Sequence, residues 1–276
     1  TCVPYRLDSV GRGRIMTVPV HIGGNVRDFV FDTGAAQFNF VSERFARENG
    51  IRMIADSIPV AGIGRGWVGL GVADSLAVGG IVMRNPVFLI SPPDQATDTI
   101  EVISAVLGNA FMRKAERFTI DNRTRHIVFP AERTLHADGT KRMANMMLNS
   151  FQPYVRIHAD GIPLLFHFDT GNVATTLYPP YYELFREQVD SCGVEDTVRI
   201  GGFAGVAENV CYRLPSVEFT LEGVPFTLRD IDVLPSGSAG ATAGSEAGSL
   251  GTDFATAFDT LTVDYTSCTV LGENVP

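Results

Sequence analysis

The feature that most constrains this chain is a tetrapeptide that occurs twice. Phe-Asp-Thr-Gly fills residues 31–34 and returns at residues 168–171, 137 positions later in a chain of 276 residues. When the two aspartates are superimposed, the preceding residues agree without gaps: Val18 with Val155, His21 with His158, Gly24 with Gly161, and Phe29 with Phe166. A chain that repeats itself at about half its length is predicted to contain two copies of one structural unit.

Both copies show the pattern of two strands joined by a turn. Alternating apolar residues lead to a turn with glycine, and an apolar run then ends at the aspartate. A short helix is predicted after each motif. The first covers residues 42–50, with Ser42 as N-cap and Gly50 as stop signal, and the second covers residues 179–193, which open with proline.

The landmarks that follow also correspond. Glycine-rich segments occur at residues 61–67 and 200–205, and each leads into alternating strands. Further on, residues 106–111 correspond to residues 249–254 in sequence and in order. We therefore predict a tandem duplication of one mostly-β unit. The expected fold is all-β, with two pseudo-twofold-related, β-barrel-like lobes and a few short helices.

The expected lobes are residues 1–135 and 136–276, joined by a polar segment at residues 130–150. A second break, at residues 235–249, consists almost entirely of small residues. Such a composition has little apolar surface to bury, so it predicts a mobile surface loop inside the second lobe.

Composition and charge narrow the class of protein. Apolar residues make up 45% of the chain and charged residues 19%, which is typical of a globular protein with a sizeable core. The net charge of −9 disfavours nucleic acid and anionic membranes as partners. No apolar run approaches the roughly 20 residues that a membrane helix needs. We expect no nucleic-acid partner, no transmembrane segment, and a monomer.

The four cysteines leave the redox compartment open. None has the CxxC spacing of a zinc or redox site, and we predict no metal. An even number fits two disulfides in an oxidising compartment, with Cys192 and Cys211 as the first pair to test. It fits four reduced thiols almost as well. Cys2, near the first residue, is a candidate lipid attachment point. The expected location is secreted, periplasmic or cell-surface.

The repeated motif carries chemistry through its two carboxyl groups. A carboxylate that ends an apolar strand is costly unless it is solvated or paired, and the glycine two residues later permits close approach by another backbone. If a twofold axis brings Asp32 and Asp169 together, both cannot ionise, and the pair holds one proton. Such a pair supplies a base and an acid together. Thr33 and Thr170 could cross-link the two loops through their hydroxyls.

On these residues the chain resembles the pepsin and retropepsin-type aspartic proteases over nearly its whole length. Each half is similar to a retropepsin subunit, with Asp-Thr-Gly, a glycine-rich flap, and an apolar-apolar-Gly element before a strand. Residues 61–67 are similar to a retropepsin flap. Ala35, Asn172 and a second flap-like stretch near Phe203 depart from the pepsin pattern. The resemblance is to a single chain with two retropepsin-like halves, of the bacterial predicted aspartyl protease type.

The resemblance implies an aspartic endopeptidase that acts on peptide or protein substrates without a cofactor. It makes Asp32 and Asp169 the catalytic pair. The other implied site residues are Thr33, Gly34, Thr170 and Gly171 in support of the pair, and Ile63, Gly64, Trp67 and Phe203 in substrate binding. An extended peptide would lie between the flaps and the pair as an added strand. Ala35 has no hydroxyl and Asn172 can bond on one side only, so the resemblance implies an asymmetric pair.

Other interpretations stay open. Two motifs at matching positions support the fold, but activity is a separate matter, so a catalytically inactive peptide-binding module of the same fold is the alternative. A carboxylate-pair glycosidase ranks last. His167 lies two residues before Asp169, and we interpret it as a packed side chain because the first copy has Val30 there. Trp67 lines the substrate cleft or supports the flap, with equal weight.

Overall fold

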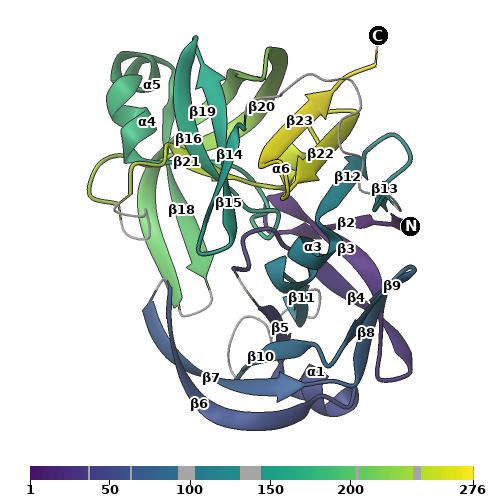
Figure 1. Ribbon diagram of the computed structural model, residues 1–276. Coiled ribbons are helices and arrows are strands. Elements are labelled where there is room, and N and C mark those ends of the chain that lie inside the picture. The colour runs from purple at the N-terminus through teal and green to yellow at the C-terminus, as the bar shows by residue number, and fades with distance from the viewer. Residues whose placement is uncertain are drawn as a thin grey trace.

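The structure, a computed structural model, describes residues 1–36, 38–62, 64–92, 103–130, 144–202, 205–238 and 244–275. Its strands form two large sheets, one in each half of the chain, and a third sheet to which both halves contribute. Figure 1 shows the first half below and the second half above, with the shared sheet on the right. The predicted all-β architecture with a few short helices is confirmed.

The sheet of the first lobe has ten strands, in the order β6-β7-β10-β5-β11-β4-β3-β8-β9 with β2 paired to β3. Its strands are β2 (Arg6–Val10), β3 (Gly13–Ile22), β4 (Asn25–Phe31), β5 (Asn39–Ser42), β6 (Arg52–Gly62), β7 (Gly64–Val72), β8 (Ser75–Val78), β9 (Ile81–Arg84), β10 (Val87–Ser91) and β11 (Ala105–Leu107). The helices among the described residues of this lobe are α1 (Glu43–Glu48) and α3 (Asn109–Ala115).

The sheet of the second lobe has eight strands, in the order β14-β15-β16-β21-β17-β20-β19-β18. Its strands are β14 (Met146–Asn149), β15 (Gln152–Ala159), β16 (Ile162–Phe168), β17 (Thr176–Leu177), β18 (Val194–Gly202), β19 (Gly205–Leu221), β20 (Val224–Val233) and β21 (Gly248–Leu250). The helices of this lobe are α4 (Pro179–Leu184), α5 (Arg186–Cys192) and α6 (Thr252–Ala255).

The third sheet joins the two halves of the chain. Its order is β1-β13-β12-β22-β23, and its strands are β1 (Cys2–Pro4), β12 (Arg117–Asp121), β13 (His126–Val128), β22 (Thr260–Asp264) and β23 (Thr269–Glu273). At its centre β12 pairs with β22. The predicted boundary between residues 135 and 136 lies outside the described residues and stays a prediction. Within the described ranges, no helix has the length and apolar composition to cross a bilayer.

The repeated strand-turn-strand pattern folds in the same way in both lobes. Strands β3 and β4 form one antiparallel hairpin, and β15 and β16 form the other. Gly24 and Gly161 occupy the turns with φ of +78° and +76°, a region that glycine adopts without steric cost. Each hairpin therefore delivers its second strand to the Asp-Thr-Gly motif.

The predicted helices form with one difference between the lobes. Ser42 caps α1 by accepting a hydrogen bond from the N–H of Phe45 at 3.1 Å, as expected. The single helix predicted over residues 179–193 is instead two helices, because Phe185 has non-helical dihedral angles between α4 and α5. Proline stands in the first turn of α4, as the sequence predicts.

Aromatic pairs fix the strands that end at the two motifs. Phe31 lies edge-on to Phe118, with ring centroids 5.0 Å apart, and Phe168 lies edge-on to Phe254 at 5.3 Å. All four side chains are fully buried. Such pairs contribute about 0.5–1.5 kcal/mol beyond the burial of their area. The residue that precedes each catalytic candidate is therefore anchored in the core.

The structure corrects the last part of the surface loop predicted at residues 235–249, whereas residues 235–238 and 244–245 lie outside the strands and are not buried. Residues 246–249 are buried, and β21 lies between β16 and β17 in the sheet. The small residues that suggested a loop are what permit this position: a Cβ on Gly248 would lie only 2.5 Å from the carbonyl oxygen of Thr176. Residues 239–243 lie outside the described residues.

Candidate active site

The two aspartates of the repeated motif stand where their strands end, at the boundary between the lobes. The N–H of Asp32, just after β4, donates to the carbonyl of Leu107 at 3.1 Å. The N–H of Asp169, just after β16, donates to the carbonyl of Leu250 at 2.9 Å. Strands β11 and β21 run parallel to β4 and β16, so they hold both aspartates by equivalent contacts.

Each carboxyl group lies on the glycine of the opposite motif. A Cβ on Gly171 would be 2.5 Å from the carboxyl carbon of Asp32, and a Cβ on Gly34 would overlap the carboxyl carbon of Asp169. The side chains of Asp32 and Asp169 hydrogen-bond to each other. The fold thus brings the two distant acids into contact, and we call this pair the dyad. Only glycine leaves room for it.

The threonines of the two motifs lock the loops together. The N–H of Thr33 donates to Oγ1 of Thr170, and the N–H of Thr170 donates to Oγ1 of Thr33, both at 3.0 Å. The hydroxyl of Thr33 donates to the carbonyl of Phe168 at 2.8 Å, and the hydroxyl of Thr170 donates to the carbonyl of Phe31. Both threonines are fully buried. This is the cross-link between loops that the sequence predicts.

Backbone N–H groups hold one oxygen of each carboxyl group. Oδ1 of Asp32 accepts from Gly34 at 2.7 Å and from Ala35 at 2.8 Å. Oδ1 of Asp169 accepts from Gly171 at 2.9 Å. These bonds fix the rotation of both carboxyl planes. Both aspartates are half-buried, so the dyad has one face toward solvent.

Electrostatics favour a protonated form of the dyad. Burial, the charge of Asp169 and the hydrogen bond between the two side chains raise the pKa of Asp32 well above its usual range. Burial also raises the pKa of Asp169, partly offset by hydrogen bonds to it. Two carboxyl groups in contact cannot both ionise, so the dyad keeps one proton at pH values where an isolated aspartate has lost it.

Further side chains, which were not among the predicted site residues, hold the backbone of the two motifs by hydrogen bonds. The side-chain amide of Asn109 donates to the carbonyl of Thr33 at 2.7 Å and accepts from the hydroxyl of Tyr265 at 2.7 Å. In the second lobe the hydroxyl of Thr252 donates to the carbonyl of Thr170 at 3.0 Å. Asn109 and Thr252 occupy equivalent positions after Gly108 and Gly251, so the repeat itself was the signal.

Both glycine-rich segments form hairpins. The first consists of β6 and β7, which close with Gly62 opposite Gly64. The second consists of β18 and β19, which close with Gly202 opposite Gly205. In Figure 1 the β18–β19 hairpin descends from the second lobe toward the side where β6 and β7 lie. Ile63 and Phe203, predicted to bind substrate, lie outside the described residues.

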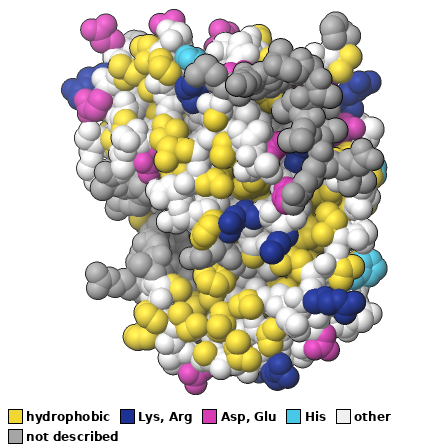
Figure 2. All heavy atoms as spheres, viewed as in Figure 1, with side chains coloured by type: hydrophobic (Ala, Val, Ile, Leu, Met, Phe, Trp, Pro, Cys, Tyr) yellow, Lys and Arg dark blue, Asp and Glu magenta, His cyan; other side chains and the backbone are white. Residues whose placement is uncertain are grey.

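Trp67 stands on β7 with 63% of its surface exposed, opposite Pro59 of β6. Figure 2 shows apolar side chains gathered over the lower part of the molecule, where the β6–β7 hairpin and β10 lie. The exposed large apolar residues of these three strands are Met53, Ile54, Trp67 and Val87. The indole is therefore free to contact another molecule, and the structure does not bury it beneath the flap.

An ion-pair network connects the first lobe to the root of the second hairpin. Arg12, in the turn between β2 and β3, contacts Asp196 of β18 at 3.4 Å and Asp232 of β20 at 2.9 Å. Arg213 of β19 contacts the same two carboxylates, at 2.6 and 2.7 Å. The second hairpin is thereby tied to both lobes at its base.

The structure corrects the candidate disulfide. All four cysteines are free thiols. Cys192 is exposed at the end of α5, whereas Cys211 is buried on β19 with its thiol hydrogen-bonded to Asp232. Burial and the nearby carboxylates raise the pKa of Cys211 to about 12, so this thiol stays protonated. Within the described ranges, no group of three His, Cys, Asp or Glu side chains could hold a metal ion.

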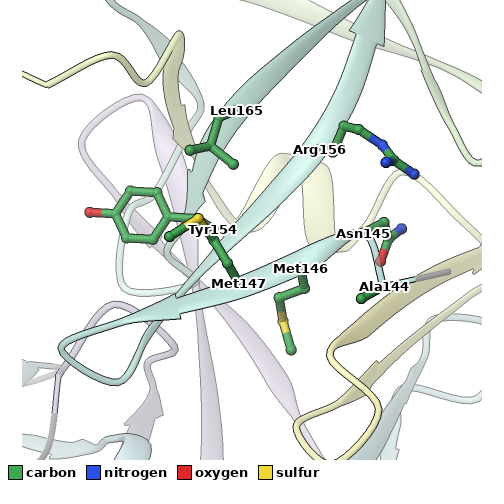
Figure 3. A pocket seen from close by; sticks show the side chains of 7 residues that line it. All are labelled: Ala144, Asn145, Met146, Met147, Tyr154, Arg156 and Leu165. Carbon is green, nitrogen blue, oxygen red and sulfur yellow. The ribbon is translucent and has the colours of Figure 1, made fainter.

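A separate recess of about 180 Å³ lies on β14 and β15, beside the strand that leads to Asp169 (Figure 3). It is lined by Ala144, Asn145, Met146, Met147, Tyr154, Arg156 and Leu165. In Figure 3 the guanidinium of Arg156 and the hydroxyl of Tyr154 point in opposite directions. Arg156 pairs with Glu222 at 2.9 Å, so its charge is already balanced.

Comparisons with known proteins agree with this geometry. Residues 18–111, which include the first motif and the first hairpin, match the family described as aspartyl protease. The crystal structure of the aspartic proteinase from Irpex lacteus matches with a TM-score of 0.56 at 12% sequence identity, over 99% of this chain and 97% of that one. No curated protein sequence matches. The pepsin/retropepsin-type fold with two lobes, expected from the repeated motif, is therefore confirmed.

Proposed function

We propose that this chain, which has the fold of the aspartic proteases and matches their family over residues 18–111, is an endopeptidase that hydrolyses peptide bonds with water activated between Asp32 and Asp169. The observation that carries the proposal is the contact between the two carboxyl groups. Each lies on the glycine of the other motif, and their pKa values are raised by burial.

The singly protonated dyad supplies the acid and the base that peptide hydrolysis needs. The ionised carboxylate takes a proton from water as the water oxygen attacks the peptide carbonyl carbon. The protonated carboxyl group donates its proton to the carbonyl oxygen, which gives a tetrahedral diol. Collapse of the diol breaks the C–N bond as the protonated carboxyl group passes its proton to the departing amine, while the other carboxylate takes a proton from a diol hydroxyl and the carboxylic acid product forms. The dyad ends with one proton, as it began.

The hairpins give the substrate a place to lie. An extended peptide between the dyad and the two hairpins would pair its backbone as an added strand. We assign Gly64 and Trp67 of the first hairpin to this role, and we propose the same role for Ile63 and Phe203, which lie outside the described residues. The exposure of Trp67 supports the assignment. The locked threonines and backbone N–H bonds keep the dyad rigid while the peptide binds.

The direct test is hydrolysis of a mixed peptide pool from acidic to neutral pH, followed by mass spectrometry. Asp32→Asn and Asp169→Asn should each lower the rate by about 10³-fold or more, because an amide can neither share the proton nor accept one from water. Asp160→Asn, in the exposed turn between β15 and β16, is the matched control and should cleave as the wild type does. Cleavage that survives Asp32→Asn would overturn the proposal.

A second outcome distinguishes the alternative function. A catalytically inactive peptide-binding module would bind extended peptides saturably and release them intact at every pH. Calorimetric titration with the same peptides, run beside the hydrolysis assay, separates this result from a failure to bind.

A further inference from the structure

Beside the dyad, the first lobe carries a small apolar cluster. Ile15, Val30, Ala35 and Val106 are buried together, with Ile103 packed against them. Val30 lies two residues before Asp32 on β4, and in the sheet it stands between Thr17 of β3 and Val106 of β11. This part of the first lobe is an ordinary apolar packing site.

The pseudo-twofold axis relates this cluster to a polar one in the second lobe. His167 lies two residues before Asp169 on β16, and it stands between Tyr154 of β15 and Ser249 of β21. The repeat gives the full correspondence: Ile15 with Gln152, Val30 with His167, Ala35 with Asn172, Ile103 with Glu246, and Val106 with Ser249. Each of these five apolar side chains is replaced by one that can form hydrogen bonds, whereas Val10 and Phe40, which also pack against the cluster, correspond to the apolar Met147 and Leu177.

His167 has hydrogen-bonding capacity that the protein leaves unused. Its ring packs on Tyr154 with centroids 5.2 Å apart, which confirms the packed histidine expected from the sequence. Its Nε2 is buried and has no hydrogen-bond partner. Burial lowers the pKa of His167, with a smaller opposing effect of Asp32 and Glu246, so the ring is neutral at pH 7. A buried polar nitrogen without a partner is costly, which points to a group that the site is built to receive.

Glu246 gives the same site its charge. It is 8% exposed, just before β21, and its carboxylate acts on the pKa values of Tyr154, His167 and Tyr178. The hydroxyl of Tyr178 forms a hydrogen bond with the side chain of Ser249. In Figure 3 the hydroxyl of Tyr154 points away from Arg156, the cation on the same strand. Within the described part of the chain, the charged groups that shift the pKa values of Tyr154 and His167 are all carboxylates.

We propose that His167, Tyr154, Tyr178, Ser249 and Glu246 form a subsite that selects a basic substrate side chain, lysine or arginine, at a position flanking the scissile bond. The inference rests on the proposed function, because it assigns a preference to the same dyad. A basic side chain would donate to Nε2 of His167 and place its charge near Glu246. Polar sites of this kind discriminate strongly, because an apolar side chain leaves their buried groups unpaired.

The test compares peptides that differ only at one residue flanking the bond that the protein cleaves, lysine or norleucine. The wild-type chain should show at least about a tenfold higher kcat/KM for the lysine peptide at one of the two flanking positions. Glu246→Gln and His167→Val, which restores the residue of the first lobe, should each lower this ratio by about tenfold. Glu218→Gln, an exposed carboxylate on β19, is the matched control and should keep the ratio.

Each outcome decides between the two proposals. An equal or inverted ratio in the wild type, or a ratio that both variants keep, overturns the subsite while cleavage still depends on Asp32. If the wild-type chain cleaves neither peptide, the proposed endopeptidase activity is overturned. Binding then tests the subsite, which predicts that the chain binds the lysine peptide more tightly than the norleucine peptide. Thermal unfolding shows which variants fold. His167→Val changes β16 and Glu246→Gln changes a residue before β21, so if one variant fails to fold, the ratio of the other decides.

Discussion

Removing one hydroxyl from the buried threonine pair should destabilise the protein far more than a surface substitution. In Thr33→Val, the carbonyl of Phe168 loses its donor and the N–H of Thr170 loses its acceptor, both at the boundary between the lobes. A buried group left without its partner costs about 1–3 kcal/mol. Two such groups give about 2–6 kcal/mol. Valine has nearly the shape of threonine and carries no hydroxyl group that must itself be buried. We therefore expect the lower half of this range, about 2–4 kcal/mol.

The assay is urea unfolding followed by far-ultraviolet circular dichroism. Thr170→Val should cost as much as Thr33→Val, because its hydroxyl makes the equivalent two bonds. Thr33→Ser keeps the hydroxyl and should recover most of the loss. Thr227→Val, on the exposed side of β20, is the control and should stay within about 0.5 kcal/mol of wild type. A loss below about 1 kcal/mol for both valine variants would show that these buried hydrogen bonds do not hold the lobes together.

Three further results are expected. Gly34→Ala should lower kcat/KM by at least about 100-fold in the peptide assay, because its Cβ would overlap the carboxyl group of Asp169 and separate the dyad; near-wild-type activity would contradict this. The raised pKa values of the dyad mean that the folded state holds a proton that the unfolded state releases. The contribution of the dyad to stability should therefore be fully present below the ordinary aspartate pKa of about 3.9 and should be lost as pH rises through the raised value, and this part of the fall in Tm should be absent in Asp32→Asn. A thiol reagent should label Cys192 in the native protein but Cys211 only after unfolding, whereas a peptide linked through both would contradict the free thiols.

The repeated motif predicted more of this site than a single motif could. Because the residues before Asp32 and Asp169 match in periodicity and in the position of glycine, both strands and both turns followed from local pattern. The cross-link by Thr33 and Thr170 followed from placing two identical loops about a twofold axis. These features depend on local sequence pattern and on the internal repeat, and both can be read from a single amino-acid sequence.

Other features depend on contacts that local pattern does not contain. Residues 247–249 resemble a loop in composition, yet they are buried because their small side chains fit between β16 and β17. The ion pairs of Arg12 join residues far apart in the chain, and nothing near Arg12 predicts Asp232. His167 could be placed on the face of Asp169, but its unpartnered Nε2 depends on what surrounds it in the fold.

The most direct measurement is the titration of the two carboxyl groups themselves, by NMR of protein with ¹³C-labelled aspartate carboxyl carbons. One proton should stay on the Asp32–Asp169 pair well above the pH at which free aspartate ionises, and replacing either residue with asparagine should abolish the split between the two titrations. Two independent titrations near the ordinary value, unchanged by substitution of the partner, would show that the acids do not share a proton.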